Sequence, residues 1–468
     1  MMSGKKVHLI GIGGSAMSNL ALMFSELGWQ VTGSDQNVYP PASTSLAASG
    51  IIFSEGYDAS NIHSDLDLVI IGNVASRDNV EALATVRQNI SYTSMAGALF
   101  DYFMFDKKRI AICGTHGKTT TTSLMAWVYQ QAKMDPSYFV GGVPNNFKQG
   151  YGLGRGDHFI IEGDEYDTAY FEKTPKFLHY HPQHVVVTSI EFDHADIYRD
   201  FEHVYTQFEK LVAQIPTDGS LLACVEHEAV KKVAQGFDRV VTYAEKNAQW
   251  TFANQTDEGH GQSFDILRKQ EKIMRVDTYL LGQHNRLNIL SVVAQAHLHG
   301  LDMQLVGKAI SSFKGVKKRQ ERIGEHNEVA IYVDFAHHPS AIATTIEGFL
   351  PMCKARRGRL IVALEPRSNT MRRKVFEKRL VKSFAGADMV CISQVFQKKD
   401  QLGQADMLSP LQVVEGLRSD NIEAFAPEST EALIDLIASK AKPHDIVLFM
   451  SNGSFEQAPS KLLQRLSA

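Results

Sequence analysis

The sequence predicts an α/β protein built from parallel sheets covered by helices, and three observations support this fold class. The chain has 468 residues, enough for about three domains of ordinary size. Hydrophobic residues make up 44% and charged residues 21%, which is typical of a globular chain. Three widely spaced segments, starting at Lys5, Lys107 and Glu328, each contain an apolar run, a turn and a helix-like pattern. Such units build helix-covered parallel sheets.

Further apolar runs complete the predicted sheets. Strands are expected at residues 66–72, 158–162, 184–188, 359–364, 389–392 and 445–450. Residues 101–108 and 313–319 have the character of linkers, so we place the domains at 1–106, 107–315 and 316–468. Residues 245–278 are polar and weakly patterned, which favours a hairpin flap.

Charge and cysteine content narrow the class of function. The 48 basic and 52 acidic residues give a formal net charge of −4, whereas proteins built to grip nucleic acid are usually basic. The four cysteines form no Cys-x-x-Cys pair, so we expect a reducing, cytoplasmic setting. No apolar run approaches 18 residues, and glycines interrupt the first apolar stretch. We therefore expect neither a membrane span nor a signal peptide.

The strongest motif is Gly114–Thr121, which reads Gly-Thr-His-Gly-Lys-Thr-Thr-Thr between a predicted strand and a predicted helix. It is a contracted form of the phosphate loop, in which glycines let backbone N–H groups approach phosphate oxygens at a helix N-terminus. Lys118 can neutralise β- and γ-phosphate charge, and the Thr119 hydroxyl can bind Mg²⁺. A chance glycine turn before a helix is the alternative.

A second glycine loop, Gly-Ile-Gly-Gly at 11–14, follows the first predicted strand. The next strand ends at Asp35, 22 residues beyond Gly13. In Rossmann dinucleotide sites, an acidic residue at about this sequence distance hydrogen-bonds the ribose of the nucleotide. The loop departs from the Gly-x-Gly-x-x-Gly pattern. By itself it leaves open a nucleotide diphosphate site, an NAD site or a structural turn.

Acidic residues follow two strands of the middle region. Glu162–Asp167 contains four acids directly after a strand, where Mg²⁺ ligands are expected in a phosphate-loop domain. Glu191, Asp193 and His194 follow another strand and so lie on the ligand side of a parallel sheet. Solvated loops are the alternative for both segments.

Polar residues also stand at a helix start and at later strand ends. His284 and Asn285 open an apolar helix, where they can contact a purine edge or cap the helix. Asp334 and His337 follow a predicted strand of the last third of the chain, and residues 365–370 and 450–455 follow two others. All of these therefore lie on the ligand edge of their sheet.

Taken in chain order, these motifs resemble the Mur ligase family, ATP-dependent enzymes that form amide bonds in peptidoglycan metabolism. The similarity covers essentially the whole chain. It implies three domains: a Rossmann-like domain that binds a UDP-sugar, a central phosphate-loop ATPase-type domain with a mainly parallel sheet, and a C-terminal Rossmann-like domain for the amine substrate. It also assigns the first glycine loop to UDP in place of NAD.

The resemblance implies roles for individual residues. The residues implied in catalysis are Lys118, Glu162, His194 and Arg319. ATP would be bound by Gly114, Thr115, His116, Gly117, Lys118, Thr119, Thr120, His284, Asn285, Arg319 and Asp334. The UDP-sugar would be bound by Gly11, Gly13, Gly14, Ser15, Ser34 and Asp35. The amine substrate would face His337, Arg367, Asn369 and Ser454, and Mg²⁺ would be held by Thr119, Glu162 and His194.

Glu209 is an additional candidate metal ligand. Several family members carry a carbamylated lysine downstream of the Asp-His pair, and it helps to hold a second Mg²⁺. Counting from His194 and anchoring on Tyr205 puts Glu209 at that position. Our hypothesis is that a carboxylate replaces the carbamate, and a carbamate on the neighbouring Lys210 would contradict it.

Segments 33–41, 164–171 and 365–371 favour one branch of the family. Members of this branch join UDP-N-acetylmuramate to the tripeptide L-Ala-γ-D-Glu-meso-diaminopimelate through an acyl phosphate, in peptidoglycan recycling. The alternative branch uses free L-alanine in de novo synthesis. ATP and Mg²⁺ are the implied cofactors. The implied partners are the two small-molecule substrates, and we expect a monomer or weak homo-oligomer that binds neither nucleic acid nor membrane.

Two rival functions lie outside the family. A nicotinamide oxidoreductase rests on the segment from Gly11 to Asp35 alone and leaves the phosphate loop unexplained. A non-catalytic nucleotide switch accounts for the phosphate loop, but it predicts ATP hydrolysis that muramoyl and amine substrates do not affect.

Overall fold

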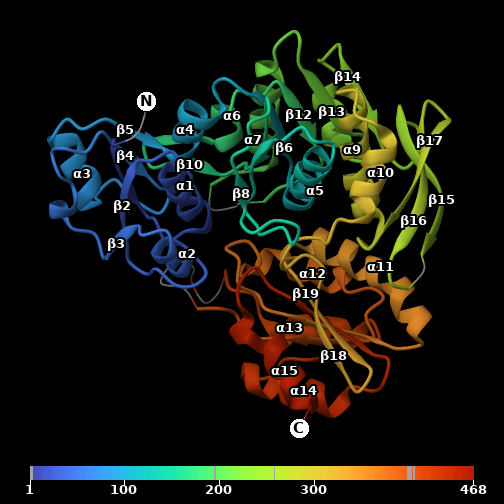
Figure 1. Ribbon diagram of the computed structural model, residues 1–468. Helices are drawn as coiled ribbons and strands as arrows, with labels where there is room; N and C mark the ends of the chain where they lie inside the picture. The colour runs from blue at the N-terminus through green and yellow to red at the C-terminus, as the bar shows by residue number, and fades with distance from the viewer. Residues whose placement is uncertain (1–3, 194–196, 258, 398–402, 404–405, 468) are drawn as a thin grey trace. The chain divides into compact units, whose positions relative to one another are not determined.

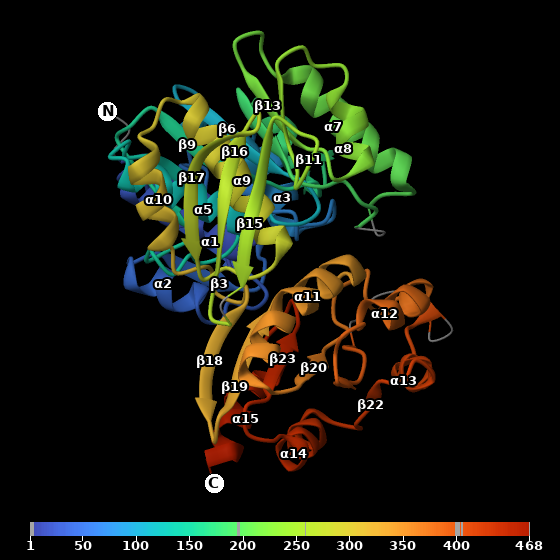
Figure 2. The ribbon, with the colours of Figure 1, turned by 90° about the vertical axis from the view of Figure 1, so that its right-hand side faces the viewer.

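The computed structural model describes residues 4–193, 197–257, 259–397, 403 and 406–467 (Figures 1 and 2). The chain divides into two compact units. Unit 1 comprises residues 1–192, 200–243 and 294–301, and unit 2 comprises residues 193–199, 244–293 and 302–468. His194 was a predicted catalytic and metal-binding residue, and it lies outside the described residues.

The first sheet of unit 1 has five parallel strands in the order β3-β2-β1-β4-β5. Its strands are β1 (Lys6–Ile10), β2 (Gln30–Asp35), β3 (Ile52–Glu55), β4 (Leu68–Ile71) and β5 (Tyr92–Ser94). The accompanying helices are α1 (Ser15–Glu26), α2 (Ala42–Ala48), α3 (Val80–Arg87) and α4 (Met95–Leu99). Strand order reverses at β1, and the crevice at such a reversal is where open α/β sheets bind ligands.

A second sheet of unit 1 has the order β14-β13-β12-β6-β9-β7-β8, parallel throughout except between β7 and β8. Its strands are β6 (Lys108–Cys113), β7 (Ser137–Phe139), β8 (Tyr151–Gly152), β9 (His158–Gly163), β12 (His184–Val187), β13 (Ser220–Cys224) and β14 (Val240–Tyr243). Its helices are α5 (Lys118–Gln131), α6 (Lys176–His179), α7 (Phe201–Gln214) and α8 (Glu228–Ala234). A small antiparallel hairpin, β10 (Asp167–Ala169) and β11 (Glu172–Pro175), follows β9.

Unit 2 begins its regular structure with three antiparallel strands in the region predicted as a hairpin flap. These are β15 (Trp250–Asp257), β16 (Gln262–Arg268) and β17 (Glu271–Thr278). The helix α9 (Gln283–Leu298) passes from unit 2 into unit 1, and α10 (Met303–Ser311) packs against β17 within unit 2.

The main sheet of unit 2 has the order β18-β19-β23-β20-β21-β22, with only β18 antiparallel to its neighbour. Its strands are β18 (Glu321–His326), β19 (Val329–Asp334), β20 (Leu360–Leu364), β21 (Met389–Ile392), β22 (Glu423–Phe425) and β23 (Ile446–Met450). Helices α11 (Pro339–Arg356), α12 (Glu377–Ser383) and α13 (Pro410–Ser419) cover one face, and α14 (Thr430–Lys440) and α15 (Ala458–Ser467) cover the other (Figure 1).

The predicted α/β fold class is confirmed, because each of the three main sheets is mostly parallel and covered by helices. The boundary predicted after residue 106 falls just before β6, and the boundary predicted after residue 315 falls between α10 and β18. Both positions remain predictions. Among the described residues, no helix combines the length and apolar character that crossing a membrane requires.

Candidate nucleotide and substrate sites

The phosphate loop of unit 1 needs both of its glycines. Gly114 has φ +131° and Gly117 has φ +82°, conformations that residues with a side chain rarely adopt. A Cβ at Gly114 would also lie 2.2 Å from Thr188 Oγ1 and 2.8 Å from the Ser189 backbone nitrogen. No side chain caps the N-terminus of α5, so its first N–H groups are available to an anion.

Lys118 is held by the acids that follow β9. Its Nζ donates to Gly114 O at 2.6 Å and lies 2.7 Å from Glu165 Oε2. Burial alone would lower the pKa of Lys118, but the charges of Glu165, Asp164 and Glu162 outweigh it, so the pKa is raised. The ammonium therefore stays charged at neutral pH, as a phosphate-binding lysine must.

Glu162 joins the phosphate loop to the neighbouring segment. The Thr119 hydroxyl donates to Glu162 Oε1 at 2.6 Å, and the Gly141 backbone nitrogen donates to Oε2 at 2.8 Å. Burial and the nearby Asp164 raise the pKa of Glu162, against the opposing effects of Lys118 and these two hydrogen bonds. The predicted residues Lys118, Thr119 and Glu162 therefore meet in one place.

Sequence reasoning missed the role of Glu165 and missed Lys176 altogether. Glu165 lies within the acidic segment predicted to supply Mg²⁺ ligands, but the sequence gives no sign that it pairs with Lys118. Lys176 is buried at the start of α6, where its Nζ lies 3.6 Å from Asp164 Oδ2 and 4.1 Å from the centre of the Tyr166 ring. Burial lowers its pKa, against the charge of Asp164. No local pattern in the sequence marks a lysine that folding brings back to a strand end.

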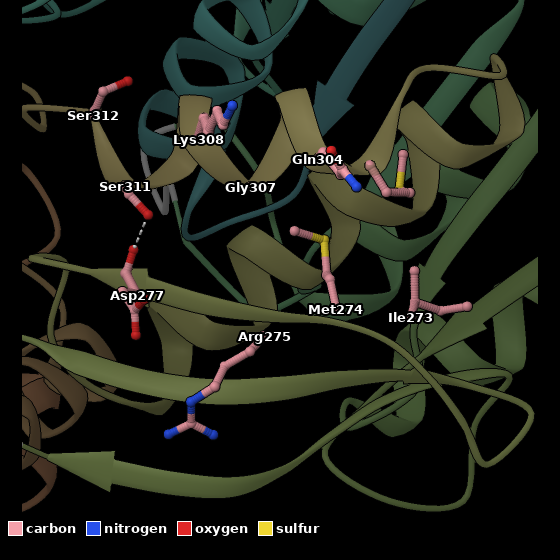
Figure 3. Close-up of a pocket in the computed structure, with 10 residues that line it drawn as sticks. Ile273, Met274, Arg275, Asp277, Gln304, Gly307, Lys308, Ser311 and Ser312 are labelled. Carbon is pink, nitrogen blue, oxygen red and sulfur yellow. Dashed lines mark hydrogen bonds between the residues drawn. The ribbon is translucent and has the colours of Figure 1, made fainter.

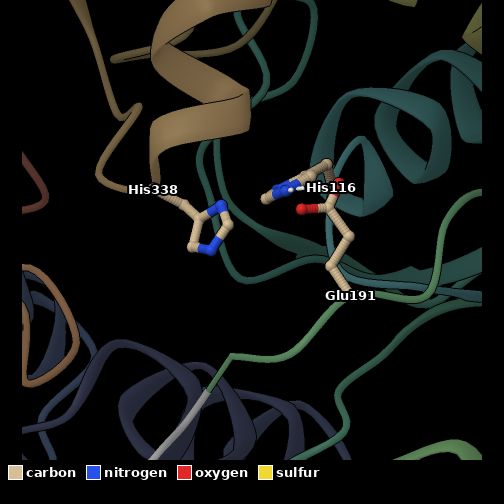
Figure 4. A group of neighbouring side chains, drawn as sticks. All are labelled: His116, Glu191 and His338. Carbon is tan, nitrogen blue, oxygen red and sulfur yellow. Dashed lines mark ion pairs between the residues drawn. The ribbon is translucent and has the colours of Figure 1, made fainter. Parts of the chain in front are cut away.

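His116 of the phosphate loop pairs with Glu191 from the segment after β12. Their Nε2 and Oε1 atoms are 3.5 Å apart, and both side chains are partly exposed (Figure 4). Thr115 Oγ1 accepts from the Glu191 backbone nitrogen at 2.9 Å, and His116 N donates to Ser189 Oγ at 3.0 Å. Two strand ends that lie far apart in the sequence are thus joined beside the phosphate loop.

The first glycine loop lies over the end of β2. The Gly11 and Ile12 backbone nitrogens donate to Ser34 O, and the Gly13 nitrogen donates to Asp35 Oδ2 at 2.9 Å. The Ser34 side chain is fully buried and its hydroxyl donates to Glu81. This hydrogen bond fixes the residue whose carbonyl oxygen accepts from the loop. Glu81, which the sequence did not single out, also accepts from Asn61 Nδ2 at 2.7 Å.

Four of the predicted nucleotide residues belong to unit 2 and gather around Gln320. Gln320 Oε1 accepts from Asn285 Nδ2 at 3.2 Å, and its Nε2 lies 3.4 Å from His284 Nε2. The Gln320 backbone nitrogen donates to Asp334 Oδ2 at 2.8 Å. Burial raises the pKa of Asp334, against the charge of Arg319, whose guanidinium lies 4.4 Å from the Phe335 ring centre. The sequence offered no signal for the bridging role of Gln320.

The predicted substrate residues lie at the carboxyl ends of three neighbouring strands of unit 2. His337 follows β19, Arg367 and Asn369 follow β20, and Ser454 follows β23. Arg367 lies 3.6 Å from the Phe396 ring centre, and its Nη1 is 3.4 Å from Glu365 Oε1. The Ser451 hydroxyl bonds to the other oxygen of Glu365.

Glu209 is exposed on α7, whose buried side chains include Val204, Gln207, Phe208 and Leu211. The neighbouring Lys210 is exposed too, with its Nζ 3.5 Å from Gln207 Oε1. The role of Glu209 at a metal stays a prediction.

A cavity of about 590 Å³ lies between β17 and α10 in unit 2 (Figure 3). It is lined by Ile273, Met274, Arg275, Asp277, Met303, Gln304, Gly307, Lys308, Ser311 and Ser312. None of the predicted site residues is among them, so we do not assign the nucleotide or substrates to this cavity.

Comparison with known proteins accounts for most of the chain. The model described as "Mur ligase family, catalytic domain" matches residues 6–103, "Mur ligase middle domain" matches 112–296, and "Mur ligase, glutamate ligase domain" matches 318–453. A Haemophilus influenzae protein named UDP-N-acetylmuramate--L-alanyl-gamma-D-glutamyl-meso-2,6-diaminoheptandioate ligase is 36% identical over 99% of both chains. A Clostridium tetani UDP-N-acetylmuramate--L-alanine ligase is 30% identical over 98% of both chains. The crystal structure of a murein peptide ligase from Psychrobacter arcticus covers 99% of both chains at 31% identity, with a TM-score of 0.71.

Proposed function

The chain belongs to the Mur ligase family, and from that premise we propose that it joins UDP-N-acetylmuramate to L-alanyl-γ-D-glutamyl-meso-diaminopimelate. It is an ATP-dependent ligase, and the bond it makes is an amide. The tripeptide is favoured over free L-alanine because the relative named for the tripeptide is 36% identical, against 30% for the relative named for L-alanine. A cytoplasmic location is part of this proposal and fits four buried cysteines that form no disulfide.

The observation that best supports the proposal is the meeting of Lys118, Thr119 and Glu162 at the N-terminus of α5. The Lys118 ammonium and the uncapped helix end supply positive charge where a triphosphate would lie. A nicotinamide site has no need of this arrangement. It is suited to stabilising charge on a transferring phosphoryl group.

Mg²⁺ is the implied metal, and the donor set fits it. The Thr119 hydroxyl and the Glu162 carboxylate lie 2.6 Å apart, and oxygen donors of this kind are the ligands that Mg²⁺ prefers. These two side chains would hold the ion. When bound, it would neutralise charge on the phosphate oxygens.

ATP is needed because a carboxylate does not react with an amine at neutral pH, since its oxygen is a very poor leaving group. In the proposed first step, the muramoyl carboxylate attacks the γ-phosphorus of ATP, and ADP leaves. Lys118 neutralises charge during this transfer. In the second step, the free amine of the tripeptide attacks the acyl carbon, phosphate leaves and the amine loses a proton. His194, His337 and Asp193 remain the candidates to accept that proton.

The decisive experiment compares phosphate release with the tripeptide and with free L-alanine at a fixed concentration of UDP-N-acetylmuramate. We expect rapid release with the tripeptide and little with L-alanine. Rapid release with L-alanine alone would support the alternative branch of the family. Release that ignores both amines and the UDP-sugar would support a nucleotide switch. Product formation that requires NAD(P) and no ATP would support an oxidoreductase.

A further inference from the structure

The strand order of the first sheet reverses between β1 and β4, and a second loop borders the crevice at this point. The sequence alone did not indicate this loop. Ile10 at the end of β1 pairs with Ile71 at the end of β4, and the Gly72 backbone nitrogen donates to Ile10 O at 2.9 Å. The β4 loop, defined as residues 72–79, therefore starts beside the first glycine loop. A Cβ at Gly11 would lie 2.5 Å from Val74 Cγ1, so the two loops touch. Ligands of open α/β sheets bind in the crevice between such loops.

This edge of the sheet has a single basic residue. Loops 11–14, 36–41, 56–58 and 72–79 follow strands β1 to β4 at their carboxyl ends, and all four are fully described. Their only lysine or arginine is Arg77, in the β4 loop. Its side chain is exposed, and it forms no ion pair with the described residues, the adjacent Asp78 included. Ion pairing with the described residues therefore does not account for this arginine.

The acid on the other side of β1 restricts where an anion can lie. Asp35 ends β2 and accepts from the Gly13 nitrogen at 2.9 Å and from the Gln36 nitrogen at 2.7 Å. A phosphate placed next to this carboxylate would be repelled. The charge pattern thus favours the β4 side of the crevice for an anionic ligand, where Arg77 stands.

The charge of Arg77 also acts on the hairpin formed by β10 and β11. Burial and the neighbouring Tyr92 raise the pKa of Tyr170, and the positive charge of Arg77 opposes that rise. Tyr170 sits between β10 and β11, in the hairpin that follows the acids bound to Lys118 and Thr119. Arg77 therefore lies within electrostatic range of the hairpin that follows those acids.

We propose that Arg77 binds the diphosphate of the sugar nucleotide across the crevice from the first glycine loop. This inference rests on the proposed function, which places a UDP-sugar in the first domain. Both phosphates of a sugar nucleotide are ionised at neutral pH, and a guanidinium can bind them through paired charge-assisted hydrogen bonds. Arg77 supplies the one full positive charge that the ligand edge of this sheet offers them.

The test measures dissociation constants of UDP and UMP for the full chain and for Arg77→Gln. In the wild type, UDP should bind more tightly than UMP, and this preference should fall as salt is added. Arg77→Gln should weaken UDP binding by about 10- to 100-fold, the range expected for a lost charged hydrogen bond. It should weaken UMP less, so the preference for UDP largely disappears. Arg77→Lys should restore part of the preference for UDP, because lysine keeps the positive charge but lacks the paired N–H donors of the guanidinium.

The matched control is Arg87→Gln, which removes an exposed arginine from the far end of α3, outside the crevice. It should leave both constants unchanged, and neither variant should change the KM for ATP or the thermal midpoint. Wild-type binding of UDP together with unchanged binding by Arg77→Gln would overturn the inference and leave the proposed function standing. An equal loss for UDP and UMP would also overturn it, because the loss would then be structural. If the wild type binds neither nucleotide, the UDP site of the proposed function is contradicted together with the role of Arg77.

Discussion

Two loops of unit 1 look alike in the backbone and differ in the charges around them. Gly11–Ser15 and Gly114–Thr119 each follow a buried parallel strand and lead into a helix whose N-terminus has no side-chain cap. Both therefore offer backbone N–H groups to an anion. The first has the acid Asp35 against it and Arg77 as its single basic neighbour, whereas the second contains Lys118, bonded to Glu165, and Thr119, bonded to Glu162.

The difference separates holding a phosphate from transferring one. Backbone amides and one arginine are enough to bind a diphosphate that takes no part in the reaction. A phosphoryl group that is being transferred spreads charge over its oxygens, and a lysine and a metal must stabilise that charge. We infer that the first loop anchors one substrate, while the second loop carries the chemistry.

The largest expected effect is that of Lys118→Met. It should reduce the rate of acyl phosphate formation by on the order of 10²- to 10³-fold, the loss typical of one missing charge-stabilising donor. UDP affinity should not change, because the first loop does not use Lys118. Rapid-quench measurement of acyl phosphate and calorimetry with UDP check the two halves of this prediction.

Because Lys118 neutralises buried acids, its loss also lowers stability, so thermal unfolding must show that the variant is folded at the assay temperature. An equal loss of UDP affinity and turnover in a folded variant would contradict the division between the loops.

Glu162→Gln should come next in size. It keeps the shape of the side chain but removes the charge that would face Mg²⁺. We expect the Mg²⁺ concentration for half-maximal activity to rise by about 10- to 100-fold. Glu202→Gln, an exposed substitution on α7, should leave it unchanged. A Mg²⁺ titration of phosphate release checks this, and an unchanged requirement in Glu162→Gln would remove Glu162 from the metal site.

Local sequence patterns were enough to predict the parts of both loops that depend on neighbouring residues. Gly114 and Gly117 adopt positive φ, and Lys118 and Thr119 begin a helix, so strand, turn and helix appear in consecutive residues. Asp35 was also predictable, because the spacing of a strand–helix–strand unit brings the end of β2 beside Gly13.

Contacts between distant segments were not predictable in this way. Glu81 reaches Ser34 across 47 residues, and Gln320 reaches Asn285 across 35 residues. Lys176 is buried beside Asp164 because the chain returns through a hairpin to the same strand end. Tertiary packing decides such contacts, and a single sequence carries no periodic signal for them.

Acid sensitivity is expected from the opposite edge of the second sheet. His158 and His184 lie at the starts of β9 and β12, and the ring centres of both lie within about 5 Å of His299, at 5.1 and 4.6 Å. Burial and the mutual repulsion of these rings lower the pKa of His184 to about 4 and that of His299 to about 3, with Lys108 adding to both shifts. At pH 7 these two histidines are neutral in the folded chain and largely neutral in the unfolded chain.

As the pH falls through about 6.5, His184 and His299 become protonated in the unfolded chain but stay neutral in the folded chain. The free energy of unfolding therefore falls until the pH reaches the folded pKa values. At pH 5 we expect a loss of about 1–2 kcal/mol for each of these two histidines. Thermal unfolding at pH 7 and pH 5 measures it. His299→Gln should narrow the difference between the two pH values, whereas the exposed His63→Gln should not. Equal pH dependence in all three proteins would show that the cluster does not control acid stability.

The smallest and most local test compares two adjacent glycines of the first loop. A Cβ at Gly13 would lie 3.0 Å from both Asn37 O and Asp35 Oδ2, while a Cβ at Gly14 would meet nothing closer than Gly11 O at 3.9 Å. Gly13→Ala must therefore push the loop away from the end of β2, and we expect UDP affinity to fall by about 10-fold, comparable to one lost hydrogen bond. Gly14→Ala should leave the loop itself in place, so UDP affinity should fall less than in Gly13→Ala. Since neither substitution touches the second loop, the KM for ATP should stay constant in both. If Gly13→Ala raised the KM for ATP as much as it weakened UDP binding, the two loops would have to act as one site, and the contrast between an anchoring loop and a reacting loop would be lost.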